Sequence, residues 1–162
     1  VENVIQIDGL WAIEIDDNRD RTIKNEHSRR TIPLHPVLID MGFVKYVQSL
    51  PKVSRVFPEL KKRSHKYSGE FSKRWGYFLR NKVMILDKAK TFHSFRHTAT
   101  NHLYQKQVSE PLLEEFNGRA GHTETTTRYT SKFRVKTLYD ECVLKLRFKI
   151  EPTLRGLKLS KS

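Results

Sequence analysis

One short run of the sequence combines an arginine with two histidines at helical spacing. We expect a helix from Thr91 to Gln105, because apolar residues recur there every three or four positions. Within it, His93, Arg96 and His97 fall within one turn of each other at about 100° per residue. A guanidinium can hold two phosphate oxygens at once, and an imidazole can donate a hydrogen bond or carry a proton. The run suits phosphate chemistry, although an ordinary surface arginine beside a half-buried histidine would look the same.

A metal site is the other chemistry that this run suggests. His93 and His97 have the i, i+4 spacing of a helical metal pair, but the glutamate of a His-Glu-x-x-His motif is absent. Cys142 is alone, which excludes a structural site built from several cysteines. We therefore expect no metal and no other cofactor. The remaining histidines that were weighed are expected to be hydrogen-bonded or on the surface: His27, His35, His97 and His102.

Two further stretches flank the run. The stretch from Ile23 to Pro36 places Lys24 before Arg30-Thr31-Ile32-Pro33-Leu34, and Gly121 to Tyr129 joins a Gly-His pair to threonines and a tyrosine. Together with His93-Ser94-Phe95-Arg96-His97, these stretches resemble three motifs of the tyrosine recombinases of the phage-integrase type. Those motifs are a lysine-bearing hairpin with its Arg-x-apolar-Pro-Leu strand, a His-x-x-Arg-His box, and a Gly-His element ending in tyrosine. They occur in the family's order and span nearly the whole chain.

The resemblance implies a site-specific DNA recombinase or integrase that cleaves and rejoins strands through a 3′-phosphotyrosyl intermediate. Tyr129 would be the nucleophile, Arg96 would contact the phosphate oxygens, and Lys24 would be the general acid for the leaving 5′-oxygen. His93 would assist proton transfer or bind phosphate, and His122 would occupy the position of the family's second His or Trp. A tyrosine hydroxyl is a weak nucleophile at its free pKa of about 10, so such a site must stabilise charge on the transition state.

Two assignments stay open. His122 precedes Tyr129 by seven residues, whereas the family usually has about nine. An alternative alignment matches Gly118-Arg119 to the Gly-His pair and puts Arg119 in that position. Tyr139 is a rival nucleophile, but we expect it inside the last helix, where a packing role is the simpler one.

The family's first catalytic arginine has no counterpart in this sequence. In the family it lies on a helix before the first strand of the sheet, whereas Arg19 and Arg21 fall in the hairpin region. We expect the chain to begin after that arginine and to be inactive as given. On this interpretation residues 1–150 are part of a catalytic domain and residues 151–162 a basic C-terminal tail.

The charge of the chain is concentrated in its middle. Lys and Arg number 31 against 18 Asp and Glu, a net charge of +13 with a pI near 10.0. Residues 1–51 carry 6 basic and 8 acidic residues (−2), residues 52–96 carry 13 and 3 (+10), and residues 97–162 carry 12 and 7 (+5). A clustered basic excess is typical of proteins that bind phosphate backbones. The expected DNA contacts are Arg29, Arg30, Lys61, Lys62, Arg63, Lys73 and Arg74.

These features set the expected partners. The clustered basic charge and the resemblance together favour double-stranded DNA as the ligand, and the resemblance implies a DNA-bound homotetramer for the full-length protein, with a mainly monomeric state for this chain alone. The lone cysteine, with no signal sequence and no apolar run of about 18 residues, indicates a cytoplasmic protein. The resemblance implies that it is bacterial or phage-encoded and associated with the nucleoid. The main alternative is a catalytically silent DNA-binding protein on the same fold. A basic RNA-binding structural protein is a more distant one.

The elements that must position these residues can also be predicted. We expect an α+β fold, mainly α, with a three-stranded antiparallel sheet at the N-terminal side packed with a helical bundle, as in integrases. Apolar residues at 92, 95, 99 and 103 should seat the helix of the His-x-x-Arg-His box in the core. The expected strands are Val4–Ile7, Leu10–Ile15 and Arg30–Leu34. The other expected helices follow Pro36, include Phe71 to Leu79, run from Ser109 to Asn117 with Gly118 as stop, and run from Val135 to Leu146.

Overall fold

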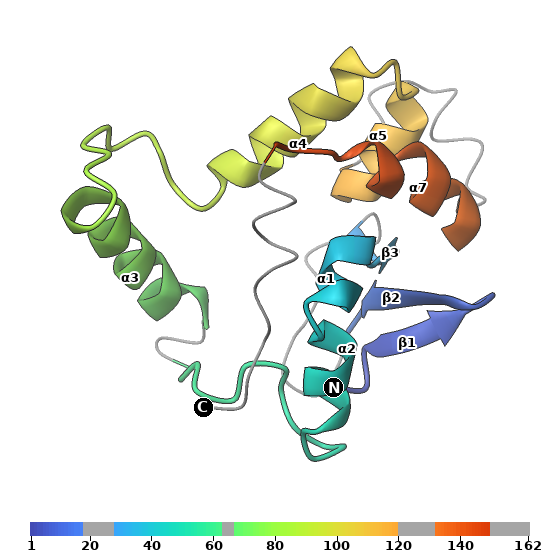
Figure 1. Ribbon diagram of the computed structural model, residues 1–162, viewed down its shortest axis with the longest axis horizontal. Helices are drawn as coiled ribbons and strands as arrows, with labels where there is room; N and C mark the ends of the chain where they lie inside the picture. The colour runs from blue at the N-terminus through green and yellow to red at the C-terminus, as the bar shows by residue number, and fades with distance from the viewer. Residues whose placement is uncertain (18–27, 63–66, 120–131, 150–162) are drawn as a thin grey trace.

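The computed structural model describes residues 1–17, 28–62, 67–119 and 132–149 (Figure 1). Several residues singled out above lie outside the described residues: Arg19, Arg21, Lys24, His27, Arg63, His122, Tyr129 and the tail 151–162. The described part is mixed α and β, with one small antiparallel sheet, as the sequence predicts.

The sheet is a meander of three strands in the order β1-β2-β3. β1 (Val4–Ile7) and β2 (Leu10–Ile15) are joined by Asp8 and Gly9, whose φ angles are 49° and 78°. Two central residues with positive φ make the tight turn whose twist fits a two-residue hairpin. β3 (Arg30–Pro33) pairs with β2 on its other side. All three strands confirm the prediction, apart from the last residue of β3.

The helix expected after Pro36 is two short helices, not one. α1 (Pro36–Asp40) and α2 (Phe43–Gln48) are separated at Gly42, where φ is +88°. A left-handed residue cannot continue a right-handed helix, and glycine adopts it without steric cost. The His35 Nδ1 accepts a hydrogen bond from the Val37 N–H at 3.2 Å and so caps α1.

The core lies where three later helices meet the sheet. α4 (Ser94–Gln105) packs on α5 (Glu110–Asn117), and α7 (Val135–Glu141) packs on α5, β2 and β3. A short 3-10 turn, η2 (Val143–Lys145), follows α7, so the helix expected to reach Leu146 changes geometry before its end. The buried side chains that fill this core are Leu103, Val108, Leu112, Leu113, Leu138 and Cys142.

A second helical region stands away from this core. α3 (Ser68–Asn81) lies on the far side of the molecule from the sheet, and α4 runs between the two regions (Figure 1). Aromatic rings join α3 to the start of α4, but Phe92 and Phe95 remain 50% and 56% exposed. The prediction that this stripe seats the whole helix in the core is therefore wrong for its first half. Among the residues of α4, Leu103, near the C-terminal end, is the one that is fully buried.

Candidate functional site

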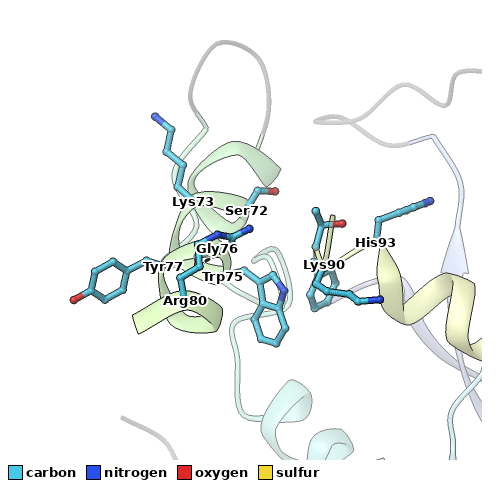
Figure 2. Close-up of a pocket in the computed structure, with 10 residues that line it drawn as sticks. Ser72, Lys73, Trp75, Gly76, Tyr77, Arg80, Lys90 and His93 are labelled. Atoms are coloured by element: carbon cyan, nitrogen blue, oxygen red, sulfur yellow. Dashed lines mark hydrogen bonds between the residues drawn. The ribbon is translucent and has the colours of Figure 1, made fainter. Parts of the chain in front are cut away.

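His93 lies at the start of α4 and not inside the helix. It occupies the N-cap position, because α4 begins at Ser94 and not at Thr91 as predicted. Its exposed ring meets the His97 ring edge-on, with 4.8 Å between centroids. His93 also borders an open cavity whose other wall is α3 (Figure 2). Within the described ranges, no three His, Cys, Asp or Glu side chains gather as a metal site would require.

Arg96 reaches from α4 to the end of α5. Its Nη2 donates a hydrogen bond to the Asn117 carbonyl oxygen at 2.5 Å, and the side chain is half-buried. A helix C-terminus leaves its last carbonyls without helical donors and carries partial negative charge, so a guanidinium is favoured there. The Arg96 Nε is buried and has no hydrogen-bond partner among the described residues. Arg96 is thus fixed in place while one of its donors remains unsatisfied.

Asn117 is the buried polar residue that holds this contact in position. Its Nδ2 donates to the Leu113 carbonyl oxygen at 2.8 Å. The Thr100 hydroxyl lies 3.2 Å from the Asn117 Oδ1 and 2.8 Å from the Arg96 carbonyl oxygen, and its one hydrogen can be donated to either. The sequence analysis missed Asn117. Its signal was a polar residue on the same helical face as Leu113, a position that apolar residues normally fill.

A second arginine lies beside the first. Burial lowers the pKa of the Arg96 guanidinium from its usual value, and the positive charge of Arg119 lowers that pKa further. Arg119 follows the left-handed Gly118, and its backbone N–H donates to the Glu114 carbonyl oxygen at 2.9 Å. Two like charges near each other favour an anion placed near both. Arg119, the alternative to His122, is therefore close to Arg96.

A third arginine approaches from the sheet. The Arg30 guanidinium, on β3, lies so near Gly118 that a Cβ built on this glycine would be 2.2 Å from the Arg30 Nη1. The same Nη1 donates to the Ser28 carbonyl oxygen at 2.9 Å. Gly118 has φ +64° as well, so a side chain there is disfavoured both by backbone strain and by Arg30. Arg30 from β3 and Arg96 from α4 thus reach the backbone of residues 117–119, the stretch that also carries Arg119. We call the side chains of Arg30, Arg96 and Arg119 the arginine cluster.

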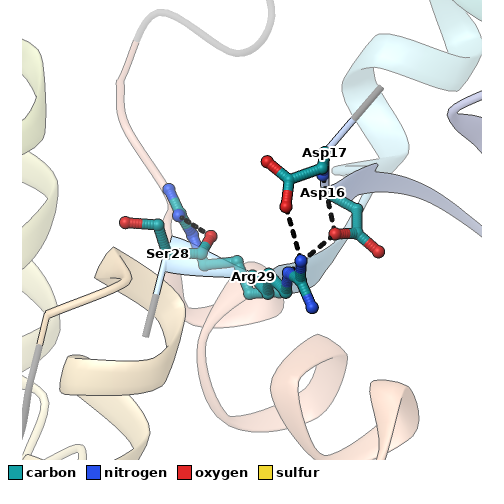
Figure 3. Close-up of polar contacts among 5 residues, drawn as sticks. Asp16, Asp17, Ser28 and Arg29 are labelled. Atoms are coloured by element: carbon teal, nitrogen blue, oxygen red, sulfur yellow. Dashed lines mark hydrogen bonds and ion pairs between the residues drawn. The ribbon is translucent and has the colours of Figure 1, made fainter. Parts of the chain in front are cut away.

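Arg29 has a different environment. Its Nε lies 2.9 Å from the Asp16 Oδ1, and its Nη2 lies 2.5 Å from the Asp17 Oδ2 (Figure 3). These two carboxylates already compensate its charge. The contact joins residues 16 and 17, which follow β2, to Arg29, which directly precedes β3. The interaction predicted between Arg29 and DNA would have to compete with this double ion pair.

Arg119 and Phe133 both contact α5. Arg119 hydrogen-bonds to the last turn of α5, as described above, and the Phe133 N–H donates to the Glu115 Oε2 at 2.9 Å. Burial raises the pKa of the Glu115 carboxyl, while the Phe133 hydrogen bond and the Lys132 charge oppose that rise. His122 and Tyr129 lie between these two residues in the chain, outside the described residues. The rival nucleophile, Tyr139, lies inside α7 as predicted and is half-buried.

The remaining predicted DNA contacts lie on or near α3. Lys61, Lys62, Lys73 and Arg74 are exposed. The Lys62 ammonium lies 5.7 Å from the Tyr67 ring centroid, and the Arg55 guanidinium, which the sequence analysis did not single out, lies 4.1 Å from it. Arg74 forms an ion pair with Glu70 at 2.5 Å. These cations lie on a different part of the surface from the arginine cluster.

His35, His97 and His102 agree with their expected roles, whereas His27 lies outside the described residues. His35 caps α1, His97 is exposed, and the His102 Nε2 lies 3.0 Å from the Lys145 carbonyl oxygen. None of the helices in the described ranges is both long and apolar enough to cross a lipid bilayer. No protein-family model, curated protein or solved structure matches the chain. Its function must therefore be argued from its own residues.

Proposed function

We propose that this chain is part of the catalytic domain of a DNA strand-exchange enzyme of the tyrosine recombinase type. The observation that carries the proposal is the convergence at residues 117–119. Arg96, from the second motif, bonds to Asn117 O, and Arg30, from the first motif, lies against Gly118. The third motif, Gly121 to Tyr129, starts two residues after Arg119 in the chain. Two motifs that are far apart in the sequence thus meet at the backbone that leads into the third.

The chemistry proposed there is a transesterification with no net oxidation. The Tyr129 hydroxyl oxygen forms a bond to phosphorus as the bond from phosphorus to the 5′-oxygen breaks, and Lys24 protonates the leaving 5′-oxygen. Arg96 stabilises the charge on the non-bridging oxygens, and His93 with His122 assists proton transfer or binds phosphate. Arg119 is the alternative to His122, and its proximity to Arg96 supports a role at the phosphate. The reaction reverses when a 5′-hydroxyl attacks the phosphotyrosine.

A covalent trapping assay tests the proposal without a known target site. A pool of random duplexes would carry a bridging sulfur in place of the 5′-oxygen at one position, because the released thiol rejoins poorly and the adduct accumulates. The resemblance implies a further arginine upstream of Val1, so the chain would be tested as given and extended upstream. The extended chain should form a protein–DNA adduct on a denaturing gel, and the given chain about 10²–10³ less, the effect of losing one charge-stabilising donor.

Matched variants assign the roles. Tyr129→Phe should abolish the adduct without changing DNA affinity, whereas Tyr139→Phe should preserve it. Lys24→Ala should stop cleavage of an ordinary phosphate but not of the bridging-sulfur substrate, because a thiolate leaves without a general acid. An adduct that survives Tyr129→Phe means the nucleophile is wrong. No adduct with the extended wild-type chain on any member of the pool would favour the catalytically silent DNA-binding protein.

The partners form part of the same proposal. The ligand is double-stranded DNA, bound largely through phosphates, so affinity should fall steeply with salt, by about 0.9 log units per log unit for each neutralised phosphate. Joining two duplexes requires several subunits, and we propose a DNA-bound homotetramer for the full-length protein. The chain alone should remain mainly monomeric. Light scattering with and without DNA tests this, and a stable tetramer without DNA would contradict it.

A further inference from the structure

An open cavity lies between α3 and the residues that lead into α4. Its volume is about 400 Å³, within the roughly 300–1,000 Å³ of small-molecule sites. One wall comes from α3, including Trp75, and the other from Lys90 to His93 (Figure 2). His93 is the first residue of the His-x-x-Arg-His box, so the cavity opens beside the proposed phosphate site.

The walls present aromatic surface that the fold leaves half exposed. Phe92 is 50% exposed although it packs edge-on against Trp75 and Phe71, with centroids 5.6 and 4.8 Å apart. The half-exposed Phe92 ring therefore offers a face on which a planar ligand can stack.

The charge of the cavity is positive. Lys73, Arg80, Lys90 and His93 are among its lining residues, and no carboxylate is among those lining residues. The Arg80 Nη1 donates to the Gly76 carbonyl oxygen at 2.8 Å, which fixes its charge at the α3 wall. The cavity also lies within the segment 52–96 that carries a net charge of +10. Aromatic faces with cations nearby are the combination that binds unpaired nucleotides, by stacking on bases and attracting phosphates.

We infer that this cavity binds an unstacked base of a single DNA strand, with its phosphates on Lys73 and Lys90. The base would lie against Phe92 and Trp75. The choice of DNA over RNA rests on the proposed function, because cleavage by Tyr129 frees a 5′ end whose first bases must leave one duplex before joining another. The stacking site itself needs no cleavage chemistry.

The test compares binding of three 12-mers to the whole chain by fluorescence anisotropy at low salt. These are oligothymidylate, an abasic oligomer with the same phosphates, and oligouridylate. Oligothymidylate should bind on the order of 10-fold more tightly than the abasic oligomer, the effect of stacking one or two bases. It should also quench tryptophan fluorescence, and Trp75→Phe, which leaves Trp11 in place, should remove most of that quenching.

Matched variants locate the site. Phe92→Leu keeps an apolar side chain but removes the ring, and it should abolish the preference for bases. Phe133→Leu, at a phenylalanine of comparable exposure away from the cavity, should not. Lys90→Ala should weaken oligothymidylate binding several-fold more than Lys88→Ala, which removes the same charge two residues away but outside the lining set. Urea midpoints of all four variants should stay close to that of the wild type.

Each outcome decides one point. Equal binding of the abasic oligomer, or equal effects of Phe92→Leu and Phe133→Leu, would overturn the base-binding site. Tighter binding of oligouridylate than of oligothymidylate would assign the cavity to RNA and overturn the inference for DNA. If the chain forms a covalent adduct but binds the abasic oligomer equally well, only the inference about the cavity is wrong. If it binds bases in the cavity but never forms an adduct, only the proposed cleavage is wrong.

Discussion

The two helical regions of this molecule bury their apolar residues very differently. Where α5 and α7 pack against α4 and the sheet, Leu103 and Cys142 are 0% exposed and Leu138 is 1% exposed. Around α3, Leu79 is the one buried residue of the helix, and the rings of Phe78, Phe92 and Phe95 stay 45% to 56% exposed. The first region therefore gains its stability from close packing, whereas the second depends on half-exposed ring contacts and on the helix itself.

The two regions therefore support two different kinds of site, a rigid one for phosphate and an accessible one for a ligand. The arginine cluster is attached to the close-packed region, where Asn117 and Gly118 fix the backbone that it contacts. A site that must hold a phosphate benefits from such a rigid support. The aromatic cavity belongs to the loosely packed region, where side chains are still accessible to a ligand. The predictions below test whether the two regions differ in stability as their burial indicates.

The largest effect should come from the closely packed core. Leu103→Ala removes a side chain with 0% exposure from the middle of the cluster, so it should lower the free energy of unfolding by about 2–5 kcal/mol. Phe95→Ala, on the same helix but 56% exposed, should cost about 1 kcal/mol. Urea unfolding followed by circular dichroism measures both. Equal losses would mean that α4 is seated in the core along its whole length.

The second-largest loss of stability should come from removing the polar contact between α4 and α5. Asn117→Ala leaves the Leu113 carbonyl and the Thr100 hydroxyl without this partner in a buried place, which should cost about 1–3 kcal/mol. Asn101→Ala, at an exposed position of α4, should change the free energy of unfolding by less than about 0.5 kcal/mol. If the two variants are equally stable in urea, Asn117 does not support the arginine cluster.

The sequence predicted the close-packed region better than the loosely packed one. The Asp8-Gly9 turn fixed the β1–β2 hairpin, and Gly118 ended α5 as expected, because both depend on local backbone preferences. The apolar spacing after Pro36 did not reveal the break at Gly42, since helical periodicity continues across a single left-handed residue. Phe92 was assigned to the core from its spacing alone, but spacing cannot tell which neighbour, if any, covers a face.

For the site, the sequence indicated which residues matter but not their contacts. Arg96 and Arg119 were both named, yet their proximity depends on how α4 packs on α5, which is a tertiary property. Arg29 and Arg30 are adjacent in the chain, and only the structure separates their environments, because Arg29 precedes β3 and pairs with Asp16 and Asp17, whereas Arg30 begins β3 and lies against Gly118. Lys24, His122 and Tyr129 lie outside the described residues, so their positions relative to Arg96 stay predictions.

Raising the pH above 9 should lower the free energy of unfolding, because the Cys142 thiol is buried in the close-packed region. Burial raises the pKa of the Cys142 thiol from its usual 9.0 to about 11, and the charge of Glu141 adds to that rise. Between these values the unfolded chain loses its thiol proton and the folded chain keeps it, so stability present below pH 9 is lost as the pH rises toward 11. By pH 10.5 the loss should be on the order of 1 kcal/mol.

The matched variant isolates this titration from those of lysine and tyrosine. Cys142→Ala should be less stable at pH 8, because it leaves a small cavity, but its stability should fall less between pH 9 and 10.5 than that of the wild type. Urea midpoints at several pH values measure both slopes. Parallel slopes would mean that the thiol titrates alike in the folded and unfolded chains.

The smallest effect should distinguish the two regions most sharply. The Arg74–Glu70 ion pair lies one helical turn apart on α3, and the Lys136–Asp140 pair has the same spacing on α7. Each should contribute about 0.2–0.5 kcal/mol. In a region that unfolds locally on its own, the lost ion-pair energy makes local unfolding easier, whereas in a closely packed core it lowers only the free energy of global unfolding.

Arg74→Gln should therefore speed amide hydrogen exchange about twofold in α3 alone, and Lys136→Gln should instead lower the global urea midpoint slightly. Faster exchange in both α3 and α5 after Arg74→Gln would mean that the two regions unfold as one unit.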